Sequence, residues 1–396
     1  MCYSLGADIK HFEMNSIHIT LTEFRNESRV IKETSSLVAL GLFERVRVVA
    51  LGADDLPERE MVTEGVDVVR IRLKTKNLPK NIIFQAIKSA EFFIRAMTQV
   101  YRFQPDVVNV HTLVLLPVGW FVKKFLRSEL VYDAHELETE VMGLRGVRKR
   151  LAKWVERCFI GSCSLVIVVS ESIADWYQKE YPIRRPFVVM NSPRRTMPGN
   201  SDKFRKILGI PAHKLIFLYQ GGLTRGRGVK ALLEAFKIRT NDDAVLVLMG
   251  YGELLADVVE ASRHCERIFF CQAVSPDVLL DWTSSADIGV SLIEPSCLSY
   301  LYCMPNKLFE YAMAGLPVMV SQTKDMAEFV ERWDIGVVLS DVTPSGINQS
   351  IDQIISNVKF NKYGKRAYRA ALCHSWEVQE LRLLEGYASM GITPSV

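Results

Sequence analysis

A loop rich in glycine and arginine, in YQGGLTRGRGVKALLEAF (219–236), is the segment best suited to bind phosphate. It follows a short apolar run and precedes a segment of helical periodicity. Glycines let backbone amides approach an anion closely, and a helix N-terminus favours negative charge. Arg225 and Arg227 would add forked donors for phosphate oxygens. The loop therefore predicts a diphosphate site, although residue types alone are equally typical of a solvated surface turn.

A second glycine pair, Gly250 and Gly252 in LMGYGELLADV (248–258), matches part of a dinucleotide-binding fingerprint. Leu255 stands where the third glycine belongs. The pair also follows the second strand of its half, whereas the fingerprint occupies the first βα turn. We therefore interpret it as a tight turn before a helix, with amides that face the same cleft as the phosphate loop, and we do not predict NAD binding.

The segment MPNKLFEYAMAGLPVMVS (304–321) predicts a helix that begins after Pro305 and ends near Gly315. Glu310 lies inside this helix, where its carboxylate could accept hydrogen bonds from two vicinal hydroxyls, as a ribose presents. The alternative is an ion pair with Lys307, three residues earlier, which is a common fate for charges on a helix.

Titratable residues follow an apolar run in LVYDAHELETE (130–140). Asp133, His135 and Glu136 stand at the predicted carboxyl end of a buried strand, where α/β folds place reacting groups. His111 ends the preceding candidate strand and could face the same space. Histidine exchanges a proton near neutral pH, so His135 is a candidate to hydrogen-bond a sugar or a phosphate. A single histidine is more often structural, and residue type alone leaves that alternative open.

The segment LRGVRKRLAKWVERCF (144–159) predicts a helix with a basic face and one acidic residue, Glu156. Its apolar residues, on the other face, are Val147, Leu151, Trp154 and Cys158. Such a helix suits the surface of an anionic membrane. The predicted membrane contacts are Arg148, Lys149, Lys153 and Trp154. A helix whose apolar face packs on the core and whose charged face is solvated explains the same pattern.

Short apolar runs rich in β-branched residues alternate with longer segments of helical periodicity, which is typical of βαβ units and a parallel sheet. The first series of predicted strands lies at 17–22, 46–51, 67–74, 106–110, 130–134, 164–170 and 186–190. Helices predicted between them include 28–43, 82–102 and 171–181. After a linker at 190–202, the second series lies at 215–220, 244–250, 267–272, 286–293, 317–322 and 336–340.

This order predicts an α/β fold with two doubly wound, Rossmann-like domains that face a cleft. The predicted domains are 1–192, 193–375 for the donor half, and 376–396 as a C-terminal helix that braces the two. Residues 1–14 lack the apolar region of a signal peptide and precede the first strand-like run, so we predict that they are disordered or not native, with Met14 as a candidate start.

Composition excludes several classes of protein. The chain has 396 residues, 48% of them hydrophobic and 24% charged, which rules out bulk disorder. The net charge of +4 is too small to imply a nucleic-acid partner. Eight scattered cysteines without a C-x-x-C pair indicate reduced thiols in a cytoplasmic protein. The apolar stretch 107–122 is shorter than the roughly 20 residues of a spanning helix.

In this order, the segments resemble the GT-B glycosyltransferases of family four, retaining enzymes that move a sugar from a nucleotide diphosphate donor. The resemblance covers nearly the whole chain. Within this family, the segments are most similar to the bacterial branch that builds O-antigen and capsule. It rests on FRNESRVIKETSSLVALG (24–41), VYDAHE (131–136), YQGGLTRGRG (219–228), VLMGYGE (247–253), ADIGVSL (286–292), PNKLFEYAMAGLPV (305–318) and SWE (375–377).

The resemblance implies that His135, Arg227 and Glu310 are the catalytic residues. The residue matching Glu310 holds the donor ribose, the basic residue matching Arg227 contacts the diphosphate, and the histidine matching His135 lies near the sugar C1. The predicted donor contacts are Gly221, Gly222, Arg225, Gly250, Gly252, Asn306, Lys307 and Leu308. Near the N-terminus, EFRNESR (23–29) replaces a loop that usually carries two glycines, which should alter acceptor contacts. The predicted acceptor contacts are Arg25, Asn26, Arg29, His111 and Glu136.

Two positions depart from the family pattern. Many members carry a second glutamate eight positions before the one matching Glu310, and this chain has Tyr302 there. The arginine that often follows the first glycine of the phosphate loop is Gly222, and Arg225 is a candidate to substitute for it. The contribution of that second carboxylate to binding the donor sugar is therefore open.

The sequence predicts a retaining glycosyltransferase that binds a nucleotide diphosphate sugar and a saccharide or polyprenyl-linked acceptor. No D-x-D triad occurs, so we expect no metal and no other cofactor. We expect a cytoplasmic protein, peripheral on an anionic membrane surface. The alternatives are a sugar-nucleotide epimerase on the same fold, with His135 and Glu136 or His111 as an acid/base pair, and a catalytically silent scaffold at the membrane.

Overall fold

The computed structural model describes residues 14–25, 27–79, 81–356 and 360–394. The chain forms two compact units. Unit 1 comprises Met1–Ala134, Trp154–Ile167 and Leu383–Val396, and unit 2 comprises His135–Lys153 and Val168–Arg382. The prediction about residues 1–14 falls, except for Met14, outside the described residues.

The first sheet has the strand order β3-β4-β2-β1-β5-β6-β7-β8. Its strands are β1 (Asn15–Ile19), β2 (Arg45–Leu51), β3 (Arg59–Thr63), β4 (Val66–Ile71), β5 (Val107–Val110), β6 (Glu129–Ala134), β7 (Leu165–Val168) and β8 (Phe187–Val188). The pairings among β1, β2, β4, β5 and β6 are parallel, as predicted. The edge strand β3 pairs antiparallel with β4 and was not predicted, because its residues alternate between exposed and half-buried and include no continuous apolar run.

The helices that follow these strands are α1 (Ser28–Ala39), α2 (Ile82–Phe103), α3 (Leu116–Leu126), α4 (Gly146–Phe159) and α5 (Glu171–Glu180). Short 3-10 turns lie at η1 (Leu113–Leu115), η2 (Glu138–Glu140) and η3 (Ile160–Ser162). The predicted helix 28–43 ends early, at Ala39, because Gly41 turns the chain with φ +71°. Ser170 caps α5, since its Oγ accepts from the Ile173 amide at 3.3 Å. Among the described residues, no helix has the length and apolar content to cross a bilayer.

The second sheet lies in unit 2 and has the strand order β11-β10-β9-β12-β13-β14, with every neighbouring pair parallel. Its strands are β9 (Leu215–Gly222), β10 (Ala244–Tyr251), β11 (Ile268–Gln272), β12 (Ile288–Ser291), β13 (Val318–Ser321) and β14 (Gly336–Leu339). All six were predicted. The strand order reverses between β9 and β12, because β10 and β11 are added on one side of β9 and β12 to β14 on the other. Doubly wound folds bind ligands outside the carboxyl ends of the strands at such a point.

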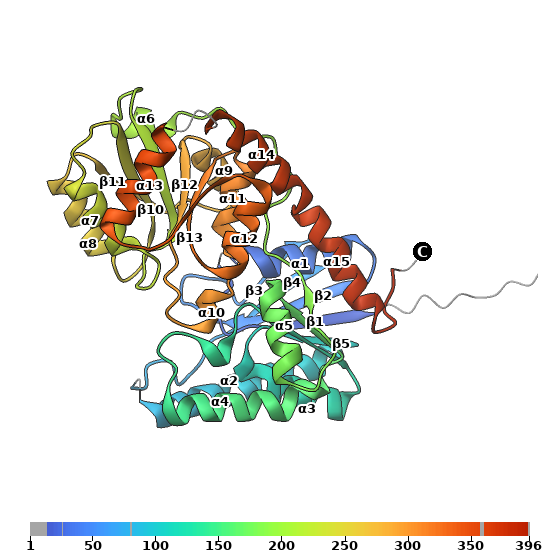
Figure 1. The fold of residues 1–396 in the computed structure, drawn as a ribbon. Coiled ribbons are helices and arrows are strands. Elements are labelled where there is room, and N and C mark those ends of the chain that lie inside the picture. Colours follow the sequence, from blue (N-terminus) through green and yellow to red (C-terminus); the bar gives the residue numbers. More distant parts are fainter. Residues whose placement is uncertain (1–13, 26, 80, 357–359, 395–396) are drawn as a thin grey trace, which may run out of the picture. The chain divides into compact units, whose positions relative to one another are not determined.

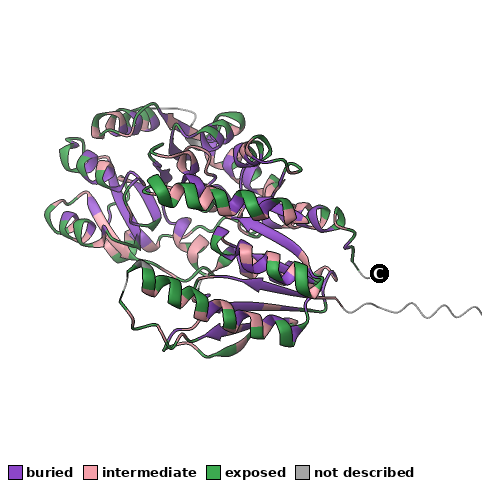
Figure 2. Ribbon diagram, turned by 90° about the horizontal axis from the view of Figure 1, so that it is seen from below, coloured by how far each residue is buried: buried purple, intermediate pink, exposed green. Residues whose placement is uncertain are grey.

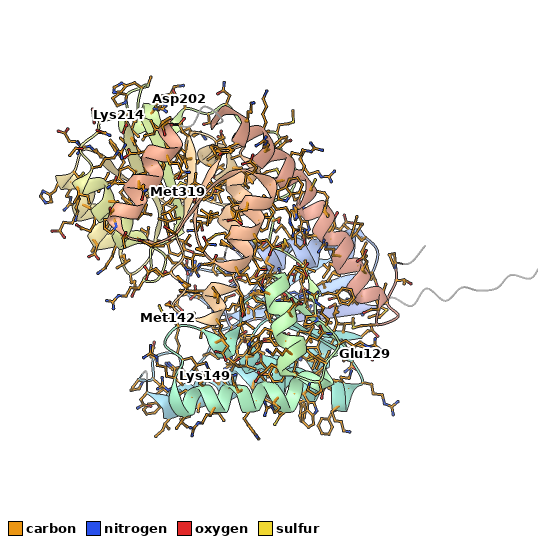
Figure 3. The ribbon with its side chains drawn as sticks, viewed as in Figure 1. Glu129, Met142, Lys149, Asp202, Lys214 and Met319 are labelled. Carbon is orange, nitrogen blue, oxygen red and sulfur yellow. The ribbon has the colours of Figure 1, made fainter. Side chains whose placement is uncertain are left out.

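Helices cover both faces of the second sheet (Figure 1). The helices of this second part of the chain are α6 (Lys203–Leu208), α7 (Val229–Ile238), α8 (Leu255–His264), α9 (Leu279–Thr283), α10 (Leu298–Leu301), α11 (Asn306–Met313), α12 (Lys324–Trp333), α13 (Pro344–Ser356), α14 (Phe360–Cys373) and α15 (Trp376–Ala388). Met319 of β13 belongs to a continuous core with α7, α8 and α13 (Figure 3). In both units the strands are largely buried and the outer faces of the helices are exposed (Figure 2). The helix α15 runs without a break from unit 2 into unit 1.

Candidate active site

A cavity of about 450 Å³ lies in unit 2 where the second sheet reverses its strand order. Its volume is within the usual range for a small-molecule site, and its place is the one that doubly wound folds use for ligands. We call it the switch-point cavity; its lining residues are 135–136, 169, 173, 219–222, 224, 227, 249–251, 273–274, 279, 299–300, 303–307 and 310.

The glycine loop forms one wall of the switch-point cavity, as a strand end, a loop and a helix start. Gly221 and Gly222 end β9 and line the cavity. Gly228 caps α7 with φ +72°, and a Cβ there would lie 2.4 Å from the Leu292 carbonyl oxygen. The Tyr219 hydroxyl donates to the Gly222 carbonyl at 2.7 Å and so fixes the end of the strand. The predicted order of strand, glycine loop and helix is confirmed.

The two arginines of this loop have different surroundings. Arg227 lines the switch-point cavity, and its guanidinium carbon lies 4.6 Å from the ring centroid of Tyr300. Arg225 does not line the cavity; its side chain is 73% exposed, and its Nε lies 3.9 Å from Glu253 Oε1. Both were predicted donor contacts, and the structure brings only Arg227 to the cavity.

Glu310 of α11 is held by an amide side chain at the cavity wall. Its Oε2 accepts from Gln220 Nε2 at 2.6 Å. The side-chain oxygen Oε1 of Gln220 in turn accepts from the Thr283 hydroxyl at 2.9 Å, and the Gln220 backbone amide donates to the Tyr311 hydroxyl oxygen at 3.0 Å. This chain of bonds fixes the orientation of the carboxylate before any ligand binds. The predicted helix around Glu310 is confirmed, with Pro305 at its N-cap.

Lys307 lies beside Arg227 in the switch-point cavity. Its Nζ is 3.7 Å from the ring centroid of Tyr219, within range of a cation–π interaction. The pKa of Lys307 is lowered to about 7, first by burial and then by the charge of Arg227, while the charge of Glu310 opposes both effects. Two cations that share one cavity repel each other, and an anion bound between them would relieve that repulsion. The pair therefore favours a polyanionic ligand.

His135 and Glu136 follow β6 directly and both line the switch-point cavity. Glu136 is exposed, and its Oε2 accepts from the Ser299 hydroxyl at 3.4 Å. The structure thus brings together His135, Arg227 and Glu310, the three predicted catalytic residues. Glu136 was predicted to contact the acceptor, and the structure places it in the same cavity as the predicted donor residues.

The other predicted donor contacts divide into two groups. Gly250 and Asn306 line the cavity. Gly252 and Leu308 do not line it. Leu308 is fully buried in the core. Gly252 packs closely on the backbone of Leu223, since a Cβ at position 252 would lie 2.5 Å from the Leu223 carbonyl oxygen. Tyr302, which stands in place of a second glutamate, also lies outside the lining, and its carbonyl accepts from the Ser170 hydroxyl at 2.6 Å.

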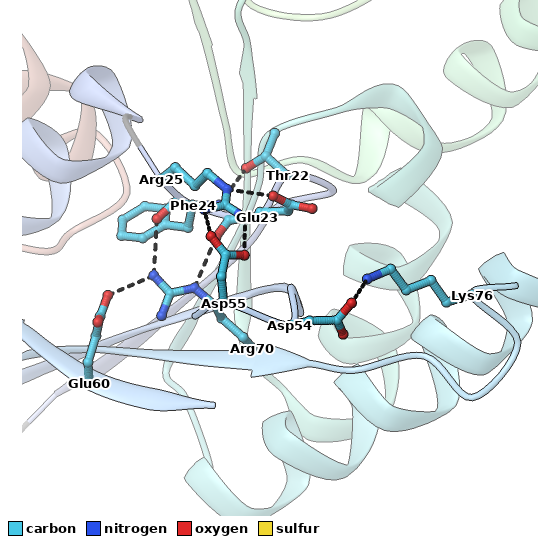
Figure 4. A network of polar contacts seen from close by, with 9 residues as sticks. All are labelled: Thr22, Glu23, Phe24, Arg25, Asp54, Asp55, Glu60, Arg70 and Lys76. Carbon is cyan, nitrogen blue, oxygen red and sulfur yellow. Dashed lines mark hydrogen bonds and ion pairs between the residues drawn. The ribbon is translucent and has the colours of Figure 1, made fainter. Parts of the chain in front are cut away.

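The predicted acceptor loop in unit 1 is held by ion pairs (Figure 4). Arg25 is exposed and donates from both terminal nitrogens to the Asp55 carboxylate at 2.6 Å. Phe24 is buried with φ +52°, a conformation that is rare for a bulky residue. The Arg70 guanidinium holds this turn by donating to the carbonyl oxygens of Glu23 and Phe24, at 3.0 and 3.1 Å. Asn26, also a predicted acceptor contact, lies outside the described residues.

Arg29 and His111, two further predicted acceptor contacts, are enclosed in the core of unit 1. Arg29 donates to both oxygens of Asp133, at 2.9 and 2.6 Å, and lies 2.9 Å from Glu33 Oε1. His111 contacts Asp133 at 3.1 Å and the ring nitrogen of His18 at 2.9 Å. Burial raises the pKa of Glu33 well above its usual value and lowers that of His18. Contact of either predicted residue with an acceptor would require this network to open.

His18, Glu33 and His111 place one possible metal-ligand atom each within 4.8 Å of the others. The Arg29 guanidinium already contacts Glu33 at 2.9 Å, so positive charge is present in the cluster without a metal. A divalent cation there would have to displace or repel this guanidinium. We therefore do not assign a metal to these residues.

The predicted membrane contacts lie on α4, where two of the four are engaged in ion pairs. Lys149 and Lys153 contact the Glu140 carboxylate at 2.5 and 2.9 Å, and Lys149 is labelled in Figure 3. Arg148 and Trp154 are exposed. The alternative of an apolar face packed on the core is wrong for α4, because Val147, Leu151 and Trp154 are all solvent-exposed.

Sequence reasoning missed several residues that shape the cavity. Tyr219 and Gln220 could have been found, because they end the strand that precedes the glycine loop. Tyr300 and Ser299 had no such signal, since they stand more than 70 residues after Arg227 and meet the cavity through a turn of α10. Cys303 also lines the cavity, and burial raises the pKa of its thiol to about 12, so the thiol stays protonated at neutral pH.

Two family descriptions match the chain. Residues 31–192 match Glycosyltransferase Family 4, and residues 214–357 match Glycosyl transferases group 1. An uncharacterised glycosyltransferase of Methanocaldococcus jannaschii is 25% identical over 336 residues, which cover 80% of this chain and 82% of that protein. The lipopolysaccharide 1,2-N-acetylglucosaminetransferase of Salmonella typhimurium is 25% identical over 228 residues, which cover 54% of this chain and 58% of that protein.

A solved structure has the same fold. The Anabaena HepE protein, in complex with UDP-glucose, superposes with a TM-score of 0.71 at 16% identity, covering 95% of this chain and all of that one. The two matched segments lie on either side of the linker and together make up about three quarters of the chain. The chain belongs to the GT-B glycosyltransferases of family four.

Proposed function

We propose that this glycosyltransferase moves a sugar from a nucleotide diphosphate sugar to an acceptor hydroxyl with retention of configuration. The observation that carries the proposal is the order of groups across the switch-point cavity. The strand order puts the ends of β11 and β10 first, the glycine loop after β9 next, and the segment after β12 last. A base laid across this edge would meet the apolar residues Met249, Ala273 and Val274. The diphosphate would meet the cations Arg227 and Lys307, and the sugar would meet the polar residues His135 and Glu136.

The residues of the cavity suit a reaction in which the diphosphate leaves. Arg227, Lys307 and the amides of the glycine loop would stabilise the negative charge that grows as the glycosidic bond breaks. Glu310, oriented by Gln220, would hold the ribose hydroxyls. His135 would orient the donor sugar at the other end of the cavity. Because two side-chain cations are available, the proposal requires no metal ion and no other cofactor.

The acceptor in this proposal is a saccharide on a polyprenyl lipid, bound by unit 1 during assembly of a cell-surface polysaccharide such as O-antigen or capsule. Two observations support it: the relative from Salmonella typhimurium that acts on lipopolysaccharide, and the exposed, basic and apolar face of α4. An anionic membrane surface is then a partner of the enzyme. The protein would act as a peripheral enzyme on the cytoplasmic face of that membrane.

A ligand panel tests the donor half of the proposal. We expect one nucleoside diphosphate among UDP, GDP, ADP and TDP to raise the unfolding temperature, equally with magnesium and with a chelator. A ligand at 100 times its dissociation constant stabilises a protein by about 2.7 kcal/mol, which differential scanning fluorimetry resolves. CMP, which lacks the second phosphate, is the matched control. No shift with any diphosphate would support the silent scaffold, and a shift that needs magnesium would contradict the metal-independent mechanism.

Replacing Glu310 with alanine should weaken the donor complex about tenfold or more, because hydrogen bonds to a charged group contribute about 1.5–3 kcal/mol. Isothermal titration with the nucleotide sugar measures this loss. Glu253→Ala is the matched control, since that carboxylate is exposed and contacts Arg225 outside the cavity. Equal donor affinity in Glu310→Ala and the native protein would remove Glu310 from the site.

An epimerase on the same fold remains a second candidate, because both His135 and Glu136 line the cavity and could act as an acid/base pair. An epimerase turns over the nucleotide sugar without an acceptor. Incubation of the nucleotide sugar with the protein alone, followed by proton NMR of the sugar, separates the two. Inversion at a ring carbon would favour the epimerase, and an unchanged sugar favours the transferase.

A further inference from the structure

We infer that α2, α3 and the C-terminal half of α4 form a surface of unit 1 that docks on an anionic lipid bilayer through inserted apolar side chains. This inference concerns α2 and α3 as much as the basic helix α4, and it does not depend on the reaction that the switch-point cavity performs. We call this surface the three-helix face. Its exposed large apolar residues are Ile83, Ile87, Ile94, Tyr101, Phe121, Phe125 and Trp154.

The apolar side chains of α2 follow one line along the helix. Ile83, Ile87, Ile94 and Tyr101 are spaced by four, seven and seven residues, so they point to nearly the same side. The row spans about 27 Å at 1.5 Å per residue. Ile94 is 65% exposed although the opposite side of the helix, with Phe92, Ala96 and Val100, is buried against the unit. The helix therefore has two apolar sides, and the unit covers only one of them.

Contacts between rings place α3 beside α2, and the end of α4 beside α3. Phe93 of α2 and Phe121 of α3 have ring centroids 6.2 Å apart, and Trp120 of α3 and Phe159 of α4 have centroids 5.5 Å apart. Phe121 also contacts Phe125, one turn later, at 4.3 Å. Figure 1 shows α2 and α3 as neighbours on one side of the first sheet. The exposed side chains thus belong to neighbouring helices.

Charge identifies the partner. The parts of these helices that belong to unit 1 are α2, α3 and Trp154–Phe159, and they carry six basic residues and two acidic ones, a surplus of four. The whole chain has a net charge of +4, so the rest of the chain has no net charge. Of the two acidic residues, Glu91 is half-buried and Glu156 is buried. The exposed basic residues of this face are Arg102, Lys124 and Arg157.

This combination favours a bilayer over a protein partner. Exposed apolar residues interspersed with arginines, and with aromatic residues at Tyr101 and Trp154, suit the boundary between headgroups and acyl chains. There the apolar tips enter the chains while the basic groups stay at the phosphates. The anionic headgroup also explains why the basic surplus gathers on this face. A protein partner or a second copy of this chain would need a complementary acidic surface instead.

Binding to vesicles tests the inference. The full-length protein should sediment with vesicles of phosphatidylglycerol and phosphatidylcholine and stay in solution with phosphatidylcholine alone. The triple variant Ile94→Ser, Phe125→Ser, Trp154→Ser should lower the partition coefficient at least tenfold, as should the charge variant Arg102→Glu, Lys124→Glu, Arg157→Glu. The matched control is Ile207→Ser with Ile238→Ser, two equally exposed isoleucines in unit 2, which should bind as the native protein does.

Thermal unfolding of each variant without vesicles shows whether the fold is kept, and a Phe125→Ser single variant replaces the triple one if it unfolds. Equal vesicle binding by the folded apolar variant and the native protein would overturn the inference. Loss in the charge variant alone would also overturn it, because the surface would then be electrostatic without insertion. A concentration-dependent dimer, seen by sedimentation velocity and abolished in the apolar variant without vesicle binding, would assign the face to a second copy.

Discussion

Replacing Arg227 with alanine should lower the turnover number of the transferase by about 10²–10³-fold, the usual loss when one preorganised donor to a developing negative charge is removed. The guanidinium lies in the switch-point cavity against Tyr300 and beside Lys307, so water cannot supply an equivalent fixed donor. Donor affinity should fall less than turnover, because the charge on the diphosphate grows toward the transition state. Steady-state kinetics with the nucleotide sugar identified by the ligand panel give both quantities.

Arg225 provides the matched control two residues earlier in the same loop. Its side chain is mostly exposed and points to Glu253 outside the cavity, so Arg225→Ala should change turnover less than threefold. The sequence predicted donor contact for both arginines, so the pair also tests that expectation. An equal loss in the two variants would mean that the loop rearranges around the donor and that Arg225 replaces the arginine missing at Gly222.

Replacing Lys307 with methionine should weaken donor binding about tenfold to a hundredfold, because one charge-assisted bond to the diphosphate is lost. Lys307→Arg keeps the charge and should recover part of this affinity. Binding to the native protein should also depend on pH. The pKa of Lys307 in the free protein is about 7, and a bound diphosphate raises it by adding negative charge. Affinity is therefore highest below pH 7 and falls, by up to tenfold per pH unit, as pH rises above it.

Isothermal titration at pH 7.0 to 8.5, in buffers of different ionisation enthalpy, measures this effect as protons taken up per donor bound. The native protein should take up a proton fraction that grows through this range, and Lys307→Arg should take up none, because arginine stays charged. Titration of the ligand is common to both proteins and cancels in the comparison. The same proton uptake in both would place the titrating group elsewhere.

Much of the fold was predictable because its signals are local. Every predicted strand is present, and the helix around Glu310 and the loop before α7 have the form that their glycines and prolines indicate. The strand β3 was missed because an exposed edge strand needs no apolar run. The prediction for α4 weighed a core-packed apolar face against a membrane surface, and local periodicity could not separate them, because it does not say which neighbours cover a helix.

The cavity was less predictable, because it depends on residues distant in sequence. Glu310 and Arg227 follow from their own motifs, whereas Gln220, which holds Glu310, and Tyr300, which packs on Arg227, are specified by the tertiary fold. The burial of Arg29 and His111 likewise depends on Asp133, a strand away. Residue type suggested acceptor contacts at these positions, and the network that encloses them is visible only once β1, β5, β6 and α1 are assembled.

The buried pair of Arg29 and Asp133 has a consequence for how this chain can evolve. The two residues are 104 positions apart, and each is nearly inaccessible to solvent. Losing one partner of such a pair costs about 3–5 kcal/mol, whereas replacing the whole buried cluster, including Glu33 and His111, by well-packed apolar residues can cost nothing. A lineage can therefore cross from one state to the other only by a concerted change or through a weakened intermediate. Among homologous sequences, these two positions should vary together.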